Sequence, residues 1–337
     1  MTTRVAVVGA GMMARRRSHA FLATERVRLC GVASRHLASA RAFGCEFEIE
    51  HCFDDYRRLL EAKPDAVLVE VPHAVQDEVV QWALEANLHI LIGGPLSCTV
   101  EGGRAILQAA SERGLLVEAG FEARYKAVWE KARSLVSQEE LGKIVALRSI
   151  ALWDAKPDSW YYQESLSGGM PLTHLTYVFL NPVRWLLGEP TYISAFANQI
   201  RHQGGDWVQE ETCAVNLMFD SSVIASMMAS YIKSGQAESW MVSILGTEGV
   251  LEIYPTEMDS GSLRLWQGDR FTSLDFAAAP DAFILQVEAF LASLTGENLC
   301  RNTPTDTLGD LYAIEAIVAS ARERRTIALP PASAVPR

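Results

Sequence analysis

The sequence predicts an α/β domain with a doubly wound parallel sheet, followed by an α+β domain whose strands are typical of an antiparallel sheet. Over about the first 120 residues, apolar and β-branched runs alternate with amphipathic helical segments. After Phe121 this alternation stops, and segments with an apolar residue at every second position follow. The chain has 337 residues, 49% hydrophobic and 21% charged, which is enough for two hydrophobic cores.

The first domain is expected to contain parallel strands joined by helices. Continuous apolar runs are typical of strands that helices cover on both faces. Amphipathic segments with a helical period lie between these runs, for example at residues 75–87 and 100–114. The predicted strands are residues 4–9, 27–33, 66–71, 88–92 and 115–119.

A glycine-rich turn follows the first predicted strand directly. Residues 9–14 read GAGMMA and fit the pattern G-x-G-x-x-G/A at the start of a helix. In this pattern Gly9 permits the tight turn, Gly11 lets the backbone approach a pyrophosphate, and Ala14 allows the helix to pack closely on the strand. The turn therefore predicts dinucleotide binding, and a purely structural glycine turn is the alternative.

The end of the second predicted strand indicates which dinucleotide is preferred. Proteins that bind NAD usually have an acidic residue there, which binds the ribose hydroxyls. This chain has Ser34 and Arg35 after Ala33 instead. A serine and a guanidinium can hold a 2′-phosphate, and no carboxylate repels it, so NADP(H) is expected to be preferred over NAD(H). The alternative is an exposed arginine that opens a helix.

Composition and charge exclude several other classes. The net charge of −11 comes from scattered acidic residues, so nucleic acid is not an expected partner. No apolar run approaches the roughly 18 residues that span a bilayer, and the amino terminus enters a strand without the layout of a signal peptide. The six cysteines and seven histidines lack zinc-site spacing, and there is no P-loop or G-x-S-x-G motif. We therefore expect a cytoplasmic protein with a small-molecule substrate, no membrane contact and no metal.

The second domain is expected to consist of period-two strands interrupted by one long helix. The helix is predicted over about residues 171–187. The strand segments are residues 143–154, 191–200, 212–220, 222–232, 240–247 and 249–254.

Six segments share features with one family of proteins and occur in that family's order. They are residues 5–14, 71–91, 120–136, 167–190, 244–253 and 281–294. Together they resemble the Gfo/Idh/MocA oxidoreductases, a family named for glucose-fructose oxidoreductase, inositol dehydrogenase and a rhizopine-catabolism protein. The resemblance implies a Rossmann domain over residues 1–122. It also implies an α+β domain over residues 123–337, with a large, mostly antiparallel open sheet for substrate binding and oligomerisation. A homo-oligomer through that sheet is therefore expected.

The chain departs from the family pattern at the position of the catalytic lysine. Family members typically carry Glu-Lys-Pro after the strand that here ends near Ile92, whereas this chain carries Gly93, Gly94 and Pro95. Gly94 stands where the lysine would be. A glycine has no side chain with which to transfer a proton.

The long helix departs from the family pattern as well. The family pattern in this helix is G-G-x-x-x-x-D-x-G-x-H-x-x-D, counted here from Gly168 and Gly169. The aspartate, glycine, histidine and last aspartate positions of this pattern hold His174, Thr176, Val178 and Asn181. The loss of a positioned acid or base typically lowers a reaction rate by about 10² to 10⁴. Sugar or inositol dehydrogenation by the family mechanism is therefore disfavoured.

His174 is the strongest remaining candidate for proton transfer. It precedes Val178 by four residues, so both are expected on the helix side that the resemblance places towards the nicotinamide. An imidazole titrates near neutral pH and can act as acid or base, or orient a substrate. The alternative is a buried histidine bonded to a neighbouring carbonyl group.

Other candidates flank these motifs. Residues 152–169 carry Trp153, Trp160, Tyr161 and Tyr162, whose rings can line a pocket for an aromatic or sugar-like substrate, or anchor a loop. The resemblance implies a substrate role for Tyr125 and Lys126, although for Lys126 a solvated helix residue is the favoured interpretation. It also implies a place near the nicotinamide ribose for His73 and Gln76, after Pro72. The run Arg15, Arg16 and Arg17 can attract phosphates or form a solvated face.

The expected site residues fall into three groups. The cofactor-binding group is Gly9, Gly11, Met12, Met13, Ala14, Ser34, Arg35, Pro72, His73, Gln76, Gly93 and Gly94. The substrate-binding group is Trp160, Lys126, Met170, Thr173 and Val178, and the catalytic group is His174, Tyr161, Tyr162 and Tyr125.

An NADP fingerprint beside lost proton-transfer residues favours an NADPH-dependent reductase of an imine, an iminium or a conjugated double bond. Such substrates need little acid catalysis. His174 or a tyrosine would supply the final proton. Two alternatives stay open. One is a non-redox isomerase, lyase, cyclase or hydrolase that uses His174 as a base, and the other is an NADP-binding regulatory protein.

Overall fold

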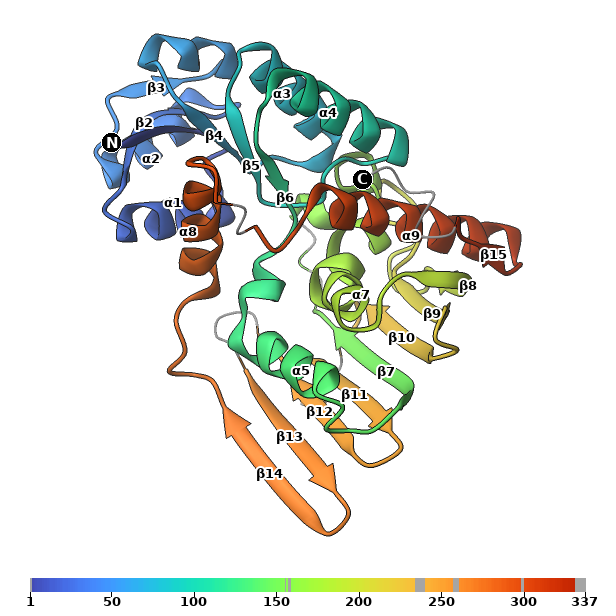
Figure 1. Cartoon of the computed structure of the whole chain (residues 1–337). Coiled ribbons are helices and arrows are strands. Elements are labelled where there is room, and N and C mark those ends of the chain that lie inside the picture. The colour runs from blue at the N-terminus through green and yellow to red at the C-terminus, as the bar shows by residue number, and fades with distance from the viewer. Residues whose placement is uncertain are drawn as a thin grey trace. The chain divides into compact units, whose positions relative to one another are not determined.

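A six-stranded parallel sheet forms the centre of the first of two structural units (Figure 1). The computed structural model describes residues 2–154, 156, 159–233, 240–256, 261–297 and 300–330. The first unit contains the described residues of Met1–Phe121 and Phe283–Leu308. The second contains the described residues of Glu122–Ala282 and Gly309–Arg337.

The first sheet has the order β3-β2-β1-β4-β5-β6, and every neighbouring pair is parallel. The strand order reverses between β1 and β4, which is where ligands bind in open α/β sheets. The predicted doubly wound sheet is confirmed. β3 was not expected, since three residues are too few to show a period. The strands are β1 (Thr3–Val8), β2 (Val27–Ala33), β3 (His51–Phe53), β4 (Ala66–Val69), β5 (His89–Ile92) and β6 (Val117–Ala119).

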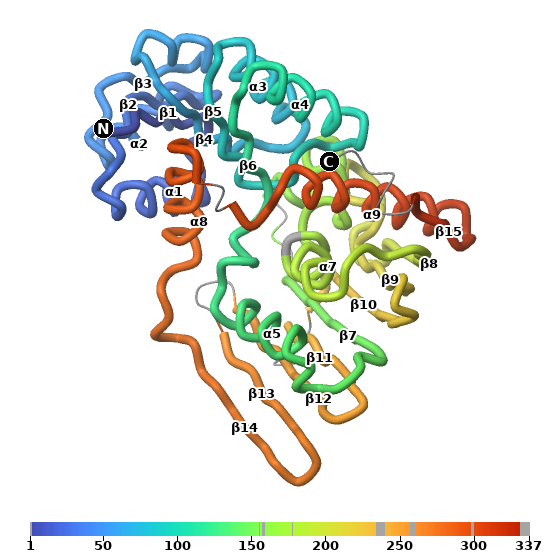
Figure 2. The backbone as a smooth tube through the Cα atoms, in the orientation of Figure 1, coloured from blue at the N-terminus to red at the C-terminus, as the bar shows by residue number. Residues whose placement is uncertain are grey.

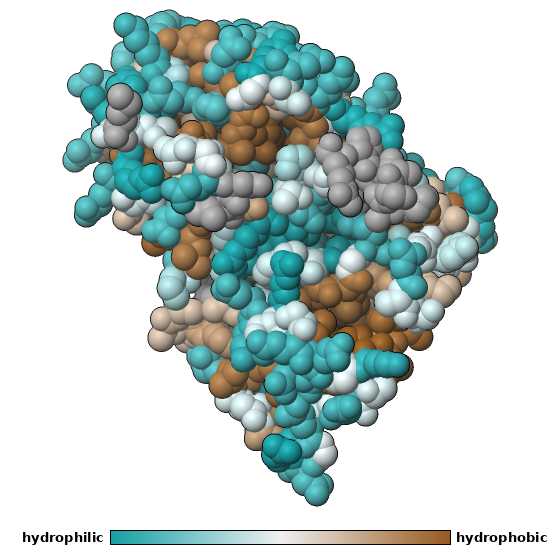
Figure 3. Space-filling view, viewed as in Figure 1, coloured by the Kyte–Doolittle hydropathy of each residue, from teal (hydrophilic) through white to brown (hydrophobic). Residues whose placement is uncertain are grey.

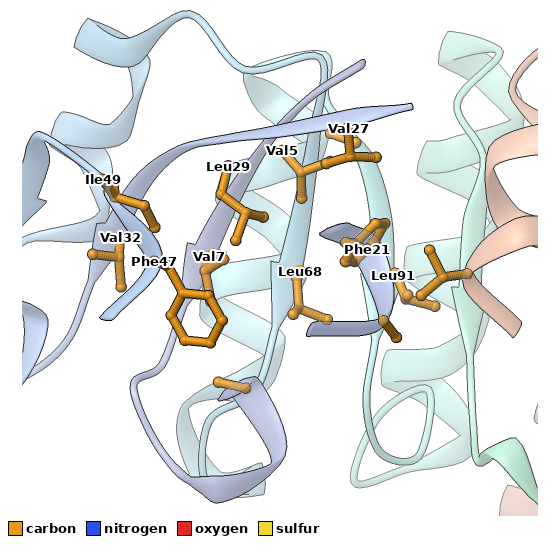
Figure 4. Close-up of a cluster of buried hydrophobic side chains, with 14 of the residues drawn as sticks. Val5, Val7, Phe21, Val27, Leu29, Val32, Phe47, Ile49, Leu68 and Leu91 are labelled. Atoms are coloured by element: carbon orange, nitrogen blue, oxygen red, sulfur yellow. The ribbon is translucent and has the colours of Figure 1, made fainter. Parts of the chain in front are cut away.

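Helices cover this sheet, and the core on one face is built from strand residues and from three helices, α1, α2 and α8. Figure 4 shows Val5, Val7, Leu68 and Leu91 of the strands together with Phe21 of α1 in this core. The helical segments of the unit are α1 (Met12–Ala23), α2 (Leu37–Phe47), η1 (Tyr56–Ala62), α3 (His73–Glu85), α4 (Val100–Arg113) and α8 (Ala282–Ser293).

Helix α8 returns to the first unit from late in the sequence. Figure 2 shows it beside α1, and the rings of Phe21 and Phe290 lie 6.4 Å apart between centroids. Phe283, Val287 and Phe290 are buried in the same core. A division of the chain at residue 122 therefore does not describe the whole first unit. The apolar face of a helix shows that it packs, but does not show against which sheet.

A nine-stranded sheet forms the second unit, in the order β14-β13-β12-β11-β7-β10-β9-β8-β15. Only the pair β7 and β10 is parallel, so the expected mostly antiparallel sheet is confirmed. The hairpin of β13 and β14 and the short β15 were not expected. The strands are β7 (Ile144–Leu152), β8 (Pro190–Asn198), β9 (Thr212–Phe219), β10 (Ile224–Ser230), β11 (Trp240–Gly246), β12 (Val250–Tyr254), β13 (Ser262–Gln267), β14 (Arg270–Asp275) and β15 (Ile327–Ala328).

One face of this sheet carries two cross-strand rows of contrasting polarity, which we call the apolar row and the polar row. Figure 3 shows hydrophobic surface in the second unit in the same view as Figure 1, in which helices lie in front of this sheet. Part of each row lines one surface depression. The exposed members of the apolar row are Tyr192, Met218, Ile224, Leu245, Trp266 and Phe271. The polar row is Arg264, Glu252, Ser243, Arg148, Ser226, Asn216 and Ser194.

The long helix expected over residues 171–187 is present, but its first part has a different geometry. Residues Pro171–Leu180 form a π-helix, labelled η4, and α7 (Asn181–Leu187) continues it. The amide of Leu175 donates to the Met170 carbonyl, five residues earlier, at 3.2 Å. Such helices are rare and are often found at functional sites.

The remaining helical segments of the second unit are η2 (Glu122–Tyr125), α5 (Ala127–Ser137), η3 (Trp160–Tyr162), α6 (Glu164–Ser167) and α9 (Pro304–Glu323), the last of which begins in the first unit. Among the described residues, no helix is long and apolar enough to cross a membrane. In the same part of the chain, no three His, Cys, Asp or Glu side chains lie close enough together to hold a metal ion.

Candidate functional site

The glycine-rich turn after β1 has the geometry that a pyrophosphate requires. Gly9 has a φ of +111°, and a Cβ there would lie 2.0 Å from the Glu70 carbonyl oxygen. A Cβ at Gly11 would have nothing within 4 Å, so the backbone is open at this position. Gly11 and Met12 are exposed at the start of α1, whereas Ala14 is buried. The turn therefore fits a dinucleotide, because its amides and the helix N-terminus are accessible to an anion.

The end of β2 lies next to this turn. The Gly9 amide donates to the Ala33 carbonyl at 2.8 Å, which ties the turn to the strand that Ser34 follows. Ser34 is half-buried, and its backbone amide donates to the Phe53 carbonyl at 3.1 Å. Arg35 is exposed. Ser34 and the exposed Arg35 thus directly follow the strand end that is hydrogen-bonded to the turn.

The arginine run does not form a solvated face. Arg17 is fully buried, and its guanidinium forms an ion pair with the Glu70 carboxylate. The guanidinium of Arg16 lies 4.5 Å from the ring centroid of Phe283. Arg15 pairs with Glu46 at 2.7 Å, and both Arg15 and Arg16 are half-buried. Helix α1 therefore uses two of its arginines for packing, because α8 covers the side on which they lie.

The space beside Gly93 and Gly94 is filled by side chains from the end of the neighbouring strand. A Cβ at Gly93 would lie between 2.0 and 2.4 Å from the Glu70 carboxylate atoms. A Cβ at Gly94 would lie 3.1 Å from His73 Nε2 and 3.6 Å from Gln76 Oε1. The two glycines are therefore not an empty gap in the site. Glu70 occupies the volume that a longer residue at Gly93 would need, whereas a side chain at Gly94 would require His73 to shift by a few tenths of an ångström.

His73 and Gln76 are positioned by the first turn of α3. Pro72 precedes this helix with an extended backbone, and both side chains are buried. The Gln76 amide donates to the Pro95 carbonyl at 2.8 Å, so the helix holds the segment that follows β5. Glu70 was not among the expected residues. The clue in the sequence was one acidic residue inside an otherwise apolar run.

In the second unit, His174 contacts two hydroxyl groups. Its Nδ1 lies 2.8 Å from the Tyr231 hydroxyl and 3.3 Å from Thr173 Oγ1. The two hydroxyl oxygens lie 2.8 Å apart. Tyr231 is fully buried, and this burial raises the pKa of its phenol well above the ordinary range. Tyr231 therefore stays neutral and can both donate and accept a hydrogen bond.

Aromatic rings surround the His174 imidazole, and we call these rings and the imidazole the His174 cluster. The ring centroids of Trp153, Tyr161 and Tyr231 lie 4.7, 5.0 and 5.1 Å from it, each at a steep angle. Tyr162 lies parallel to the imidazole at 6.2 Å. The ring-rich segment expected at residues 152–169 thus meets the helix candidate. Trp160 stacks on Tyr161 at 3.9 Å, and both are partly exposed.

Several expected residues lie in the protein core instead. Tyr125 is buried in η2, and Met170 and Val178 are buried in the second unit. Lys126 is also buried, which corrects the expectation of a solvated residue. Its Nζ donates to the Thr256 carbonyl at 2.7 Å and lies 3.4 Å from a Glu122 carboxylate oxygen.

Asn181, at the last aspartate position of the family pattern, belongs to a buried polar network. Its side-chain Nδ2 donates to the Asp310 carboxylate at 2.7 Å, and its side-chain Oδ1 accepts from Arg124 Nε at 3.0 Å. Arg184 forms an ion pair with the same aspartate. Buried charges are stable when they are paired and hydrogen-bonded, so this network has a structural role.

Two further functional candidates, Tyr231 and His202, were not expected from the sequence. Tyr231 directly follows a strand, and only its contact with His174 shows its importance. His202 Nδ1 lies 2.6 Å from the buried Glu211 carboxylate, and the His202 ring stacks on Trp207 at 3.8 Å. No local pattern in the sequence marks these contacts.

The parallel sheet with its glycine-rich turn, followed by a unit built on an antiparallel sheet, defines a nicotinamide dinucleotide-binding protein. The model of the oxidoreductase family with an NAD-binding Rossmann fold matches residues 3–121. The model of the GFO/IDH/MocA C-terminal domain matches residues 129–252. The chain belongs to the Gfo/Idh/MocA family of oxidoreductases, whose members bind NAD(P).

Individual relatives support this assignment. The dTDP-3,4-didehydro-2,6-dideoxy-alpha-D-glucose 3-reductase of Saccharopolyspora spinosa is 29% identical over 206 residues, which are 60% of this chain and 62% of that protein. The match thus spans less than two thirds of that relative. The D-xylose 1-dehydrogenase (NADP(+)) 2 of Haloferax volcanii is 24% identical over 305 residues, 88% of this chain and 91% of that protein. The structure of an aldose-aldose oxidoreductase from Caulobacter crescentus superposes with a TM-score of 0.86 at 25% identity, over 98% of this chain and 100% of that chain.

Proposed function

We propose that this chain is an NADP(H)-dependent oxidoreductase that interconverts a carbonyl and a hydroxyl group on a sugar-like small molecule. The observation that carries the proposal is the contact of His174 Nδ1 with the Tyr231 hydroxyl at 2.8 Å, inside a cluster of aromatic rings. The sugar-like substrate is supported by the relatives, whose names describe a keto-sugar reductase and a xylose dehydrogenase.

The preference for NADP(H) rests on the end of β2. Ser34 and the exposed Arg35 follow the strand that is tied to the glycine-rich turn. A guanidinium binds a phosphate through charge-assisted hydrogen bonds, whereas a carboxylate at this place would repel it. Both residues therefore favour the nucleotide that carries a 2′-phosphate.

His174 is the proton-transfer residue of the proposed reaction. A bound nicotinamide dinucleotide would supply hydride to a carbonyl carbon or accept hydride from a carbinol carbon. In reduction, His174 gives a proton to the carbonyl oxygen, which becomes a hydroxyl group. In oxidation, the imidazole removes the hydroxyl proton. A histidine suits both directions because it titrates near neutral pH.

The expected imine or conjugated substrate was based on a lack of proton-transfer groups. The His174 cluster weakens that reason, since it holds an imidazole against two hydroxyl groups. A carbonyl substrate is therefore favoured. Tyr161 presents a partly exposed ring next to His174, and the partly exposed ring of Trp160 stacks on Tyr161. Such rings can pack against the apolar face of a sugar.

The test is turnover with 4-deuterated NADPH and a panel of keto sugars and cyclic imines. We expect deuterium on the new carbinol carbon of a keto sugar, and product without deuterium would exclude the proposal. Turnover without any nicotinamide that is lost in His174→Ala would indicate a non-redox enzyme. Labelled amine from imines alone would support the imine reductase. Tight NADP(H) binding with no change in any substrate would indicate a regulatory protein.

A homo-oligomer through the nine-stranded sheet is the second part of the proposal. The apolar row exposes six large side chains, and the adjacent polar row places Arg148 and Glu252 one strand to either side of Ser243. A two-fold axis above Ser243, parallel to the strands, would bring Arg148 of each copy opposite Glu252 of the other. The face is therefore self-complementary in charge, as an isologous interface requires.

A further inference from the structure

Tyr231 and Thr173 form a chain of hydroxyl groups that ends at His174. Tyr231 follows β10, and its amide donates to the Glu211 carbonyl at 2.9 Å, which fixes the residue in the sheet. Its hydroxyl lies 2.8 Å from Thr173 Oγ1 on one side and 2.8 Å from His174 Nδ1 on the other. Thr173 Oγ1 lies 3.1 Å from the Gly169 carbonyl oxygen. The order of groups is therefore carbonyl, threonine, tyrosine and imidazole.

The number of hydrogens in this chain permits two arrangements. In the first, Thr173 donates to the Gly169 carbonyl, Tyr231 donates to Thr173, and Tyr231 accepts from a protonated His174 Nδ1. In the second, Thr173 donates to Tyr231 and Tyr231 donates to an unprotonated Nδ1. Each hydroxyl has one hydrogen and can also accept, so no group loses its partner in either arrangement. The Gly169 carbonyl also accepts from the Thr173 amide at 3.2 Å, and it is satisfied in both.

The two arrangements have opposite consequences at the other nitrogen of the ring. In the first, Nδ1 carries the hydrogen of the neutral imidazole, and Nε2 is a proton acceptor. In the second, Nε2 carries the hydrogen of the neutral imidazole and is a hydrogen-bond donor. The imidazolium fits the first arrangement, since its Nδ1 also donates to Tyr231, and its Nε2 can give up a proton. The two neutral arrangements differ by the rotation of two hydroxyl hydrogens and by the transfer of the ring hydrogen from Nδ1 to Nε2.

We propose that Thr173 and Tyr231 are positioning residues that hold His174 at Nδ1 and set its tautomer, so that Nε2 accepts a proton in the neutral Nδ1–H ring and gives it up from the imidazolium. This inference rests on the proposed role of His174. The aromatic rings restrict the imidazole plane, with Trp153 at 4.7 Å and Tyr161 at 5.0 Å between centroids. Ring packing and the hydroxyl chain thus restrict His174 in two different ways. The rings set the plane of the imidazole, and the chain sets which nitrogen carries the proton.

The test measures the tautomers of His174 by ¹⁵N NMR of the full chain without nucleotide or substrate. In Tyr231→Phe we expect the Nδ1 resonance to move and the ratio of the two neutral tautomers to change. Tyr254→Phe is the matched control, because it also removes a tyrosine hydroxyl that bonds to a side chain, here Glu252 at 3.0 Å. Nitrogen resonances in Tyr231→Phe that agree with those of the control would overturn the proposal.

A second pair of variants changes Thr173, the middle group of the hydroxyl chain, and leaves Tyr231 unchanged. Thr173→Ser keeps a hydroxyl group, whereas Thr173→Val keeps the shape and loses it. We expect wild-type tautomers in the serine variant and an altered ratio in the valine variant. Equal ratios in the two variants would contradict the chain of hydroxyl groups, even if Tyr231→Phe failed to fold.

Turnover separates this inference from the proposed function. Tyr231→Phe should lower kcat by about threefold to tenfold with KM little changed, the effect of one hydrogen bond that matters during proton transfer. Changed tautomers together with wild-type turnover would support the hydroxyl contact and overturn His174 as the proton-transfer residue. Unchanged tautomers with lowered turnover would overturn the positioning role and leave the proposed function standing.

Discussion

The glycine-rich turn of the first unit and the His174 cluster of the second are built in opposite ways. The turn offers backbone amides from residues 9–14, a single local segment after β1. The cluster consists of side chains from separate segments, and His174 and Tyr231 are 57 positions apart. A backbone site is recognisable from a short motif, whereas a side-chain site exists only after distant segments meet. Changes to the two regions should therefore have separable effects.

The largest expected effect is the loss of turnover in His174→Ala. We expect kcat to fall by about 10² to 10⁴ because the proposed acid and base is removed. The affinity for NADPH should be unchanged, since His174 is not part of the glycine-rich turn. Steady-state kinetics and a fluorescence titration of NADPH measure the two quantities. A weakened nucleotide affinity would show that the two regions are not independent, and near-normal kcat would exclude His174 as the proton-transfer residue.

The glycines provide a matched pair that separates folding from binding. Gly93→Ala should lower the free energy of unfolding by about 3 kcal/mol, because the new Cβ would lie 2.0 Å from a Glu70 carboxylate oxygen that pairs with buried Arg17. Gly11→Ala should change stability by only about 0.5 kcal/mol, since its Cβ would point into open space. It should instead weaken NADPH binding about tenfold, because the backbone can no longer approach the pyrophosphate.

Urea unfolding measures the first effect and nucleotide titration the second. The double variant Gly93→Ala with Glu70→Ala is the control for the steric cause. If Gly93→Ala is equally destabilising with and without Glu70, the space is not limited by that carboxylate. Weaker nucleotide binding in the single variant Gly93→Ala would show that Gly93 also contributes to binding, so the two glycines would not have separate roles.

The nucleotide preference depends on a side chain beside the backbone site. Arg35→Ala should weaken binding of NADPH by about tenfold to a hundredfold and leave NADH binding almost unchanged, the loss of a charge-assisted hydrogen bond. Arg41→Ala, which removes another exposed arginine, is the control. The ratio of the two dissociation constants is the measurement. Equal losses for NADPH and NADH would argue against a contact with the 2′-phosphate.

The smallest expected effect concerns the outer face of the nine-stranded sheet, which belongs to neither candidate site. Arg148→Glu should weaken self-association about tenfold, since it would bring like charges together in the proposed interface. Arg148→Glu combined with Glu252→Arg should restore association, because the exchange keeps the row self-complementary. Sedimentation measures both. If Arg148→Glu leaves self-association unchanged, any interface between copies lies on another surface.

The fold was largely predictable, because hydrophobic period and glycine position are local properties of the chain. Five of the six strands in the parallel sheet and the first six of the second sheet follow from period and composition. The return of α8 to the first unit did not follow, since an apolar helix face does not specify its partner. The π-helix at Pro171–Leu180 was also missed, because a single apolar stripe does not distinguish it from an α-helix.

The candidate site was predictable only in part. His174 was found from its place in the helix, and the rings of residues 160–162 from their density. The burial of Lys126 and the partner of His174 were not predictable, because both depend on segments far away in the chain. The roles assigned to these residues stay predictions until the variants are measured.

The sequence by itself determined the doubly wound sheet, the turn that opens to a pyrophosphate and the absence of a side chain after β5. The tertiary structure decided what that absence means. The carboxylate of Glu70 fills the space beside Gly93, and His73 lies close to Gly94, so the position of the first glycine is set by a neighbouring side chain. The physical reason is that backbone conformation is set by adjacent residues, whereas the volume around a residue is set by strands that only folding brings together.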